Sequence, residues 1–160
     1  MKRRILVLML VMAAPLCLFS YDLADFDRVA DFSVTVKTLS GLSEAEARAS
    51  GLMQKLLLLD ATVTSMQFID ANEESFTVEL ELVSGEWVGL EEVKMYSCLV
   101  RFQGRPFFRI FPRRPPRNPG PSVILPNDRI LVLAKAVSQT RTENGEPLWL
   151  LAGLHARPLR

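Results

Sequence analysis

The sequence has one histidine and two cysteines among its 160 residues, and this scarcity removes several kinds of site. A nucleophilic triad of the Ser-His-Asp or Cys-His type needs a histidine as base, yet His155 lies five residues from the C-terminus. Zinc sites need clustered cysteine and histidine, which the chain does not have. A glycine-rich phosphate loop and a dinucleotide fingerprint are absent as well. We therefore expect no metal or cofactor, and we expect His155 to be an exposed or edge-strand residue.

The two cysteines fall in different parts of the chain. Cys17 lies in an apolar N-terminal run, so removal of that run would leave Cys98 as the only thiol. One thiol cannot form an internal disulfide, which excludes a disulfide scaffold. Cys98 alternates with Val100 and Phe102, so we predict a buried, inert thiol, with an intermolecular disulfide as the alternative.

Residues 1–20 have the layout of a secretory signal. Three basic residues open the chain, and the fifteen residues from Ile5 to Phe19 carry no charge. This run is shorter than the roughly twenty residues that span a bilayer comfortably, so we expect cleavage after Ser20 rather than a permanent anchor. The predicted location is outside a bacterial cytoplasm, in the periplasm or at the outer surface, with membrane anchoring if the signal is retained.

Two details of the signal leave alternatives open. Leu18 would stand at position −3 of a cut after Ser20, where a small residue is usual. Cys17 resembles a lipobox cysteine only loosely, because no small residue precedes it directly. The cut site and lipidation at Cys17 are therefore not fixed by the sequence.

The stretch from Phe76 to Phe111 has the alternation of β-strands. Apolar and polar residues alternate from Phe76 to Val83, with the period of two typical of a half-buried strand. Strands this close in sequence usually pair as antiparallel neighbours, so we expect a meander. Further strands are predicted at 93–96, 98–102 and 107–111, with turns at Ser84-Gly85, Gly89 and 103–106.

One segment, residues 43–59, has the pattern of an amphipathic helix. Ser43 and Glu46 have the spacing of a capping box, and apolar residues then recur at helical spacing. Gly51 costs about 1 kcal/mol relative to alanine, so packing must stabilise this helix. We expect the helix to plug a curved sheet, and a partner-binding groove is the alternative. Strands are predicted on either side, at 32–37 and 61–69.

The C-terminal part reads as two strands joined by a hairpin turn at Asn144-Gly145. The pieces LPNDRILVLAKAV and PLWLLAGL resemble the last two strands of an OB-type barrel, over about thirty residues and without a diagnostic motif. A resemblance to a fold implies no function. The expected class is α+β and mainly β: a small antiparallel barrel or meander, OB-like, with one capped amphipathic helix. One domain, 32–160, would follow the signal peptide at 1–20 and an acidic lead-in at 21–31.

Charge is the clearest functional signal in the sequence. Residues 21–95 carry fifteen acidic and five basic side chains, whereas residues 96–160 carry eleven basic and three acidic ones. The segment 112–129 is rich in proline and arginine, which predicts an extended, exposed loop. Six arginines fall within seventeen residues and are the candidate anion- or partner-binding residues: Arg101, Arg105, Arg109, Arg113, Arg114 and Arg117.

Three interpretations of these charges compete. The arginines could be a solvated face, a patch that grips phosphate or carboxylate, or part of a proline-rich docking peptide. OB-type folds bind single-stranded nucleic acid with basic grooves and stacked aromatics, and Phe107, Phe108 and Phe111 lie among the arginines. Export argues against nucleic acid and for an acidic envelope protein, an anionic lipid or a cell-wall polymer.

The functional hypothesis is therefore an exported, non-enzymatic binding or assembly component of the cell envelope. Membrane contact would be through the signal segment or peripheral, and the oligomeric state is open. The alternative is a small carboxylate-dependent hydrolase or lyase acting on an envelope glycan. Against it, Glu79 and Glu81 read as the wet face of a strand, and Glu91-Glu92 as a turn.

Overall fold

The structure is a computed structural model that describes residues 29–142 and 145–159. The predicted signal peptide, Cys17, most of the acidic lead-in and Asn144 lie outside the described residues. Five long strands and one short strand make up the described fold: β1 (Ala30–Asp31), β2 (Leu56–Asp70), β3 (Thr77–Val88), β4 (Glu92–Gln103), β5 (Arg129–Arg141) and β6 (Pro147–Pro158).

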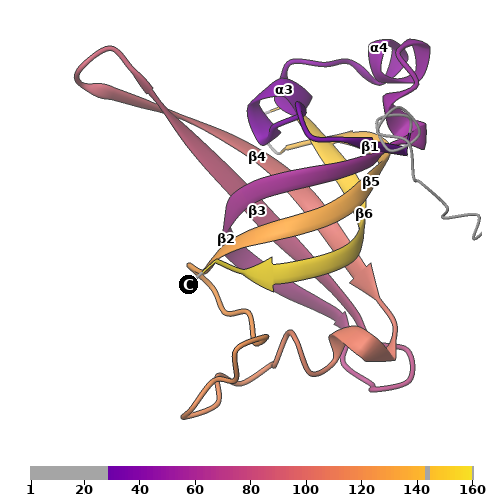
Figure 1. The fold of residues 1–160 in the computed structure, drawn as a ribbon, viewed down its shortest axis with the longest axis vertical. Helices are drawn as coiled ribbons and strands as arrows, with labels where there is room; N and C mark the ends of the chain where they lie inside the picture. The colour runs from indigo at the N-terminus through magenta and orange to yellow at the C-terminus, as the bar shows by residue number, and fades with distance from the viewer. Residues whose placement is uncertain (1–28, 143–144, 160) are drawn as a thin grey trace, which may run out of the picture.

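The five long strands close into a barrel (Figure 1). Their order is β2-β3-β4-β6-β5, and β5 pairs back onto β2. Neighbours are antiparallel except β4 and β6, which run parallel with Cys98 opposite Trp149. A meander of three strands followed by a crossed pair that completes the ring is the OB-type arrangement, so the predicted fold class is confirmed.

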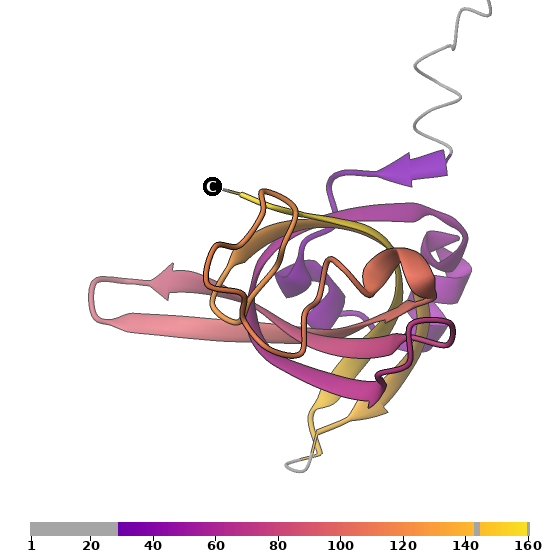
Figure 2. The same cartoon turned by 90° about the horizontal axis from the view of Figure 1, so that it is seen from below.

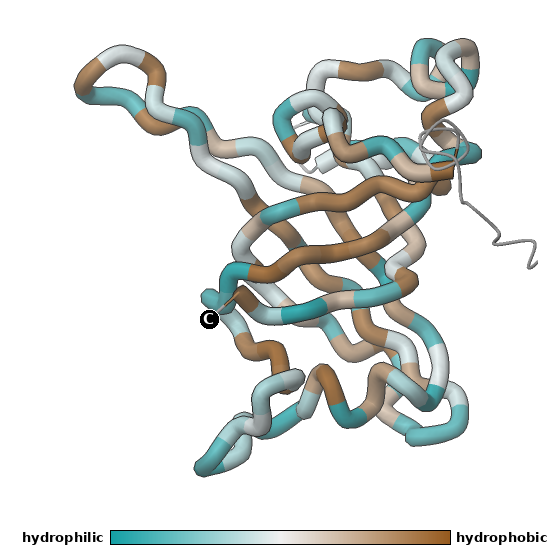
Figure 3. Tube along the Cα trace, in the orientation of Figure 1, coloured by the Kyte–Doolittle hydropathy of each residue, from teal (hydrophilic) through white to brown (hydrophobic). Residues whose placement is uncertain are grey.

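Alternation along each strand fills the interior of the barrel. Val78, Leu80 and Leu82 on β3 are fully buried, whereas the glutamates between them face outward. Brown, apolar residues accordingly mark the strands in Figure 3. Trp149 and Phe102 are the largest side chains of this core, and the described residues contain no buried polar or charged side chain. The interior of the barrel is therefore an apolar core filled by side chains.

The upper end of the barrel in Figure 1 is covered by α3 (Val36–Ser40), which Figure 2 shows through the ring of strands. The strand predicted at 32–37 is wrong: residues 32–35 form a bend and an irregular stretch, and α3 begins at Val36. Thr35 and Thr38 form a reciprocal capping box, and Val36 and Leu39 are buried. The alternation at 32–37 did not mark one buried face, because Val34 and Val36 are buried whereas Phe32 is exposed.

The single long helix predicted at 43–59 is wrong after its first turns. Its capping box is confirmed, since the Ser43 side chain accepts a hydrogen bond from the Glu46 amide, but α4 ends at Ala49 (Glu44–Ala49). Gly51 then takes a left-handed φ of 74° before the short helix η1 (Leu52–Gln54). The leucines at 56–59 open β2 and pair with β5. No helix among the described residues is long and apolar enough to cross a membrane.

The lower end of the barrel is closed by the connection from β4 to β5. The strand predicted at 107–111 is wrong: η2 (Arg105–Phe107) and turns occupy this stretch. Phe111 and Ile124 are fully buried beneath the barrel. Figure 2 shows the connection lying across the lower opening. Phe111 thus helps to fill the lower opening of the barrel and is not part of a strand.

The β3–β4 hairpin continues past the barrel as a two-stranded projection, which we call the arm (residues 84–96; Figure 1). The turn predicted at Ser84-Gly85 is wrong, because both residues continue β3 and the chain reverses only after Val88. A Cβ at Gly85 would lie 3.2 Å from the Met95 sulfur and from a methyl of Val93. Gly85 therefore leaves room for two side chains of β4.

Candidate functional site

The candidate site is the connection from β4 to β5, residues 104–128, which we call the basic segment. It contains five arginines, and no acidic residue occurs from position 93 to position 127. Backbone hydrogen bonds fix it at both ends. The Gly104 amide donates to Phe76 O at 2.7 Å, and the Asn127 amide donates to Val63 O at 2.7 Å.

Further contacts hold the middle of the basic segment against the barrel. The Ile124 amide donates to Ile110 O at 2.9 Å, so the two limbs of the segment are tied together beside the buried Phe111. The Asp128 carboxylate accepts a hydrogen bond from the Leu125 amide at 3.0 Å. The exposed residues 113–122 thus leave and return at fixed points.

The aromatic residues of the segment serve the core. The Phe102 ring lies 4.9 Å from both Phe107 and Phe111, measured between centroids. Phe108 meets Phe76 edge to face at 5.6 Å. These three phenylalanines therefore do not form the row of exposed rings that stacked bases require.

The structure divides the six candidate arginines into two groups. Arg101 lies on β4 and donates to Glu79 of β3 at 2.8 Å. Arg105 donates to Glu73 at 3.1 Å and lies 3.7 Å from a Glu74 oxygen. Gly104 ends the strand, so Arg101 does not share a strand face with Arg105 and Arg109. Two of the six guanidinium groups thus already have acidic partners.

The other four candidates have no acidic partner in the part of the chain that the structure describes. They are exposed, and no ion pair joins them to any other described residue: Arg109, Arg113, Arg114 and Arg117. Three of them, Arg113, Arg114 and Arg117, lie among the prolines between Pro112 and Pro119. Their role in binding stays a prediction.

Two cavities open on the barrel surface. The first, about 510 Å³, lies between the end of α3, the base of the arm on β4 and the described residues that follow β5, of which Glu146 is the one acidic residue in its lining. The second, about 420 Å³, lies where β3 leaves β2, and it contains Asp60 and Arg129. These two side chains pair at 2.6 Å. Among the residues that the structure describes, neither cavity is lined by two carboxylates.

The carboxyl groups of the described residues show no sign of a general acid. Every resolved shift lowers the carboxyl pKa, and in each case the largest cause is a hydrogen bond from a neighbouring group; the residues are Asp31, Glu44, Glu46, Asp70 and Glu86. A catalytic acid needs the opposite, a raised pKa. No group of three metal-binding side chains occurs in this part of the chain.

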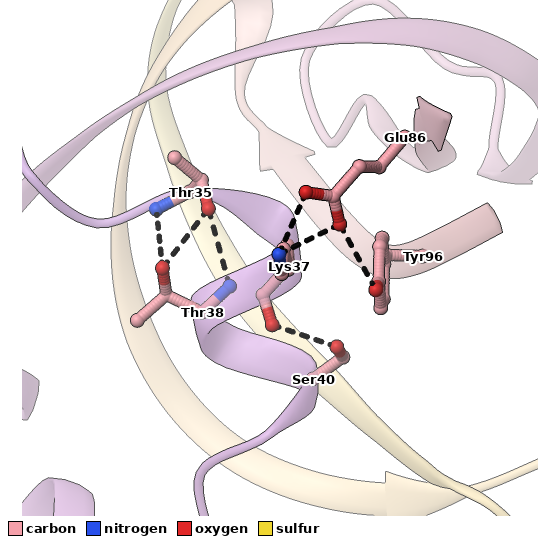
Figure 4. A network of polar contacts seen from close by, with 6 residues as sticks. All are labelled: Thr35, Lys37, Thr38, Ser40, Glu86 and Tyr96. Atoms are coloured by element: carbon pink, nitrogen blue, oxygen red, sulfur yellow. Dashed lines mark hydrogen bonds and ion pairs between the residues drawn. The ribbon is translucent and has the colours of Figure 1, made fainter. Parts of the chain in front are cut away.

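A polar network joins α3 to the base of the arm (Figure 4). Lys37 Nζ lies 2.6 Å from a Glu86 oxygen, and the Tyr96 hydroxyl donates to Glu86 at 3.3 Å. The bond from Lys37 lowers the pKa of Glu86, and the same contact raises the pKa of Lys37. The network holds the inner face of the arm against the helix that covers the barrel.

Cys98 and His155 lie where the sequence predicts. Cys98 is fully buried on β4, and its burial raises the pKa of the thiol to about 12. His155 is exposed on β6, opposite Leu133 of β5. Neither residue lines one of the two cavities.

The sequence prediction missed the outer face of the arm. Trp87 and Met95 lie there, exposed by 70% and 61%, and Leu90 at the tip is 96% exposed. The signal was present as an apolar run, Trp87-Val88, that follows an alternating strand. It was not used because Ser84-Gly85 was interpreted as the end of that strand.

Comparisons with known proteins assign neither a family nor a ligand to the chain. No family model matches the chain, and no curated protein matches it significantly. Among solved structures, the chain is similar to the mitochondrial single-stranded DNA-binding protein of S. cerevisiae, with 10% identity and a TM-score of 0.39 over 66% of this chain and 95% of that one. It is also similar to the small single-stranded DNA-binding protein of Streptomyces coelicolor, with 10% identity and a TM-score of 0.38 over 65% and 91% of the two chains. At this distance neither structure bears on what the present chain binds.

Proposed function

We propose that this chain is an exported, non-enzymatic binding protein of the cell envelope that engages an anionic partner through the basic segment. The observation that carries the proposal is the group of four exposed arginines without an acidic partner among the described residues. A guanidinium group binds phosphate or carboxylate oxygens in a bidentate manner and always carries its charge. An anion that meets these arginines therefore has no internal carboxylate to displace.

The attachment of the basic segment favours binding further. Its ends are hydrogen-bonded to β2 and to the residue before β3, and Phe111 is buried under the barrel. A loop that is already held in place loses less conformational entropy on binding than a free one. The prolines around Arg113, Arg114 and Arg117 limit the backbone in the same way.

Two other functions have less support. A carboxylate-dependent hydrolase needs two acidic residues in one cavity and one of them with a raised pKa, and the described residues offer neither feature. For nucleic acid, the outer face of β3 and β4 is the surface that OB-type barrels use. Here that face carries Glu79 and Glu81 against Arg101 alone, which repels phosphates.

Export rests on the signal-like residues 1–20 and has its own test. The intact mass of the protein recovered from envelope fractions of the producing cell would report the N-terminus directly. We expect the mass of a chain that lacks about twenty residues. Recovery of the complete chain from the cytoplasm would contradict export. The proposal that the basic segment binds an anion would then still be tested by the titrations below.

The binding proposal is tested with defined anions. The purified protein is titrated with inorganic polyphosphate and, separately, with vesicles that contain an anionic phospholipid, at low and at physiological salt. We expect binding that weakens as salt rises, because exposed charges are screened. The variant Arg113/Arg114/Arg117→Gln should bind at least one probe much more weakly than the wild type.

A matched control separates the basic segment from net charge. The variant Lys135/Arg141/Arg157→Gln removes the same three charges from exposed positions on β5 and β6. It should bind nearly as well as the wild type. Equal weakening by both triple variants would mean that only the total charge matters, and no binding by the wild type would contradict the proposal.

A further inference from the structure

The outer face of the arm is an apolar surface without a partner among the described residues. Trp87, Val93 and Met95 lie on this face, exposed by 70%, 42% and 61%, and Trp87 lies opposite Val93 in the ladder. Their polar counterparts, Glu86 and Tyr96, lie on the other face with Lys37 of α3. The arm is therefore amphipathic, and its apolar side points away from the helix that covers the barrel.

The arm also has free backbone edges. β2 leaves β3 after Val83, and β6 joins β4 only from Cys98 onward, so within residues 29–142 and 145–159 the two strands of the arm pair only with each other. An isolated two-stranded hairpin is marginally stable in water. A bare edge next to an apolar face is a template for pairing with another strand.

The charges at the arm tip decide which occupant fits. Glu91 and Glu92 are exposed directly beside Leu90, and a carboxylate is costly to bring into an apolar lipid layer. Lys94 follows two residues later on the same face of β4 as Glu92, and both are exposed. An edge that offers one acidic and one basic side chain, two positions apart, is complementary to itself in antiparallel pairing.

We propose that the occupant is a second copy of this chain, joined through the exposed edge of β4 in the arm. In the antiparallel register with the two-fold axis at Val93, Glu92 of each copy lies opposite Lys94 of the other. Residues directly opposite on antiparallel strands share a face, so two opposite-charge pairs form at once. A register centred at Lys94 would instead place two lysines against each other.

This pairing is consistent with the shape of the molecule. The arm extends beyond the barrel in both views, so two arms can meet near their tips while the barrels stay at opposite ends (Figures 1 and 2). The union would be a four-stranded sheet whose one face gathers Trp87, Val93 and Met95 from both copies. Val93 of the two copies would lie directly opposite on that face and cover part of each other's apolar surface, and the new backbone hydrogen bonds would satisfy both free edges.

The test is a charge swap read out by oligomeric state. Sedimentation of the full-length protein at rising concentration should show a monomer that converts to a dimer. Glu92→Lys and Lys94→Glu should each weaken the dimer about tenfold, because each creates two like-charge pairs. The double variant Glu92→Lys/Lys94→Glu should restore it.

The controls make each outcome informative. Lys135→Glu changes the charge by the same amount as Lys94→Glu on the barrel wall, at an exposed position of β5, and should leave the dimer unchanged. A wild type that stays monomeric would overturn the proposal. Glu92 and Lys94 would then be charges that prevent the exposed edge of β4 from pairing with another strand. A double variant that fails to recover would overturn the register. The protein could also stay monomeric and shift its tryptophan emission to the blue only when uncharged lipid vesicles are added. That result would contradict pairing with a second copy and would indicate that the arm binds a lipid surface.

Discussion

Gly153 of β6 lies against the ring of Phe102 on β4, and a Cβ at position 153 would be 2.4 Å from the ring atom Cε1. Phe102 has no room to move away, because it is fully buried with Phe107 and Phe111 at 4.9 Å. The absent side chain of Gly153 is thus part of the core packing. β4 and β6 are also the one parallel pair of the barrel, so this contact lies where the ring of strands closes.

Gly153→Ala should therefore destabilise the fold by overpacking. We expect a loss of about 1–3 kcal/mol in the free energy of unfolding, measured by urea denaturation. Gly120→Ala is the control, because nothing lies within 4 Å of a Cβ at that position. A Gly153→Ala protein as stable as the wild type would show that Phe102 can shift after all.

Phe111 is expected to anchor the basic segment as well as the core. Phe111→Ala removes a fully buried ring at the lower end of the barrel, and we expect a loss of about 3–5 kcal/mol in stability. Amide hydrogen exchange should also become faster at Ile124, whose amide donates to Ile110 O beside this ring. Phe111→Leu keeps much of the apolar volume and should show a smaller change of both kinds. Unchanged hydrogen exchange at Ile124 would show that the buried Phe111 ring does not hold the basic segment in place.

The ion pair between Lys37 and Glu86 predicts a pH dependence of the arm. Lys37 lowers the pKa of Glu86, so the contribution of the pair is present above the ordinary carboxyl pKa and is lost as the pH falls through the lowered value. NMR titration of the Glu86 carboxyl should give a midpoint below that of an exposed glutamate. In Lys37→Gln the midpoint should return upward, and resonances of the arm should broaden at neutral pH. A Glu86 midpoint that Lys37→Gln leaves in place would contradict the assignment.

Cys98 should be chemically silent in the folded protein. Burial raises its pKa to about 12, so at pH 8 almost no thiolate is present and the sulfur is shielded. A thiol reagent such as Ellman's should react with it only after denaturant is added. Rapid reaction in native buffer, or a dimer that disappears on reduction, would instead support the intermolecular disulfide that the sequence left open.

The strands were predictable where one face alone is buried. The period of two in Val78, Leu80 and Leu82 predicts β3. The apolar pattern of the last two strands likewise predicts the OB-type closing pair. The strand formed by the leucines at 56–59 was not predictable, because an apolar run fits a buried helix and a strand equally well. Only the pairing of Leu57 and Leu59 with β5, far along the chain, decides between them.

The candidate site was predictable in composition but not in geometry. The sequence shows six arginines within seventeen residues. Arg101 and Arg105, however, form ion pairs with Glu79 and Glu73, which lie more than twenty residues away in the sequence. Such long-range pairs depend on strand register, which local pattern does not reveal. The arm was missed for a related reason. A glycine in a strand was interpreted as a turn, and its real role is to make room for Met95 across the ladder.

The central claim, that the basic segment binds an anionic partner in the cell envelope, is tested most directly by crosslinking in native envelopes. Wild type, Arg113/Arg114/Arg117→Ser and the control Lys135/Arg141/Arg157→Gln are compared for what they capture. We expect one defined anionic partner that is recovered with the wild type and the control and lost with the Arg113/Arg114/Arg117 variant. Identical recovery from all three proteins, or none from the wild type, would contradict the claim and leave these arginines as a solvated surface.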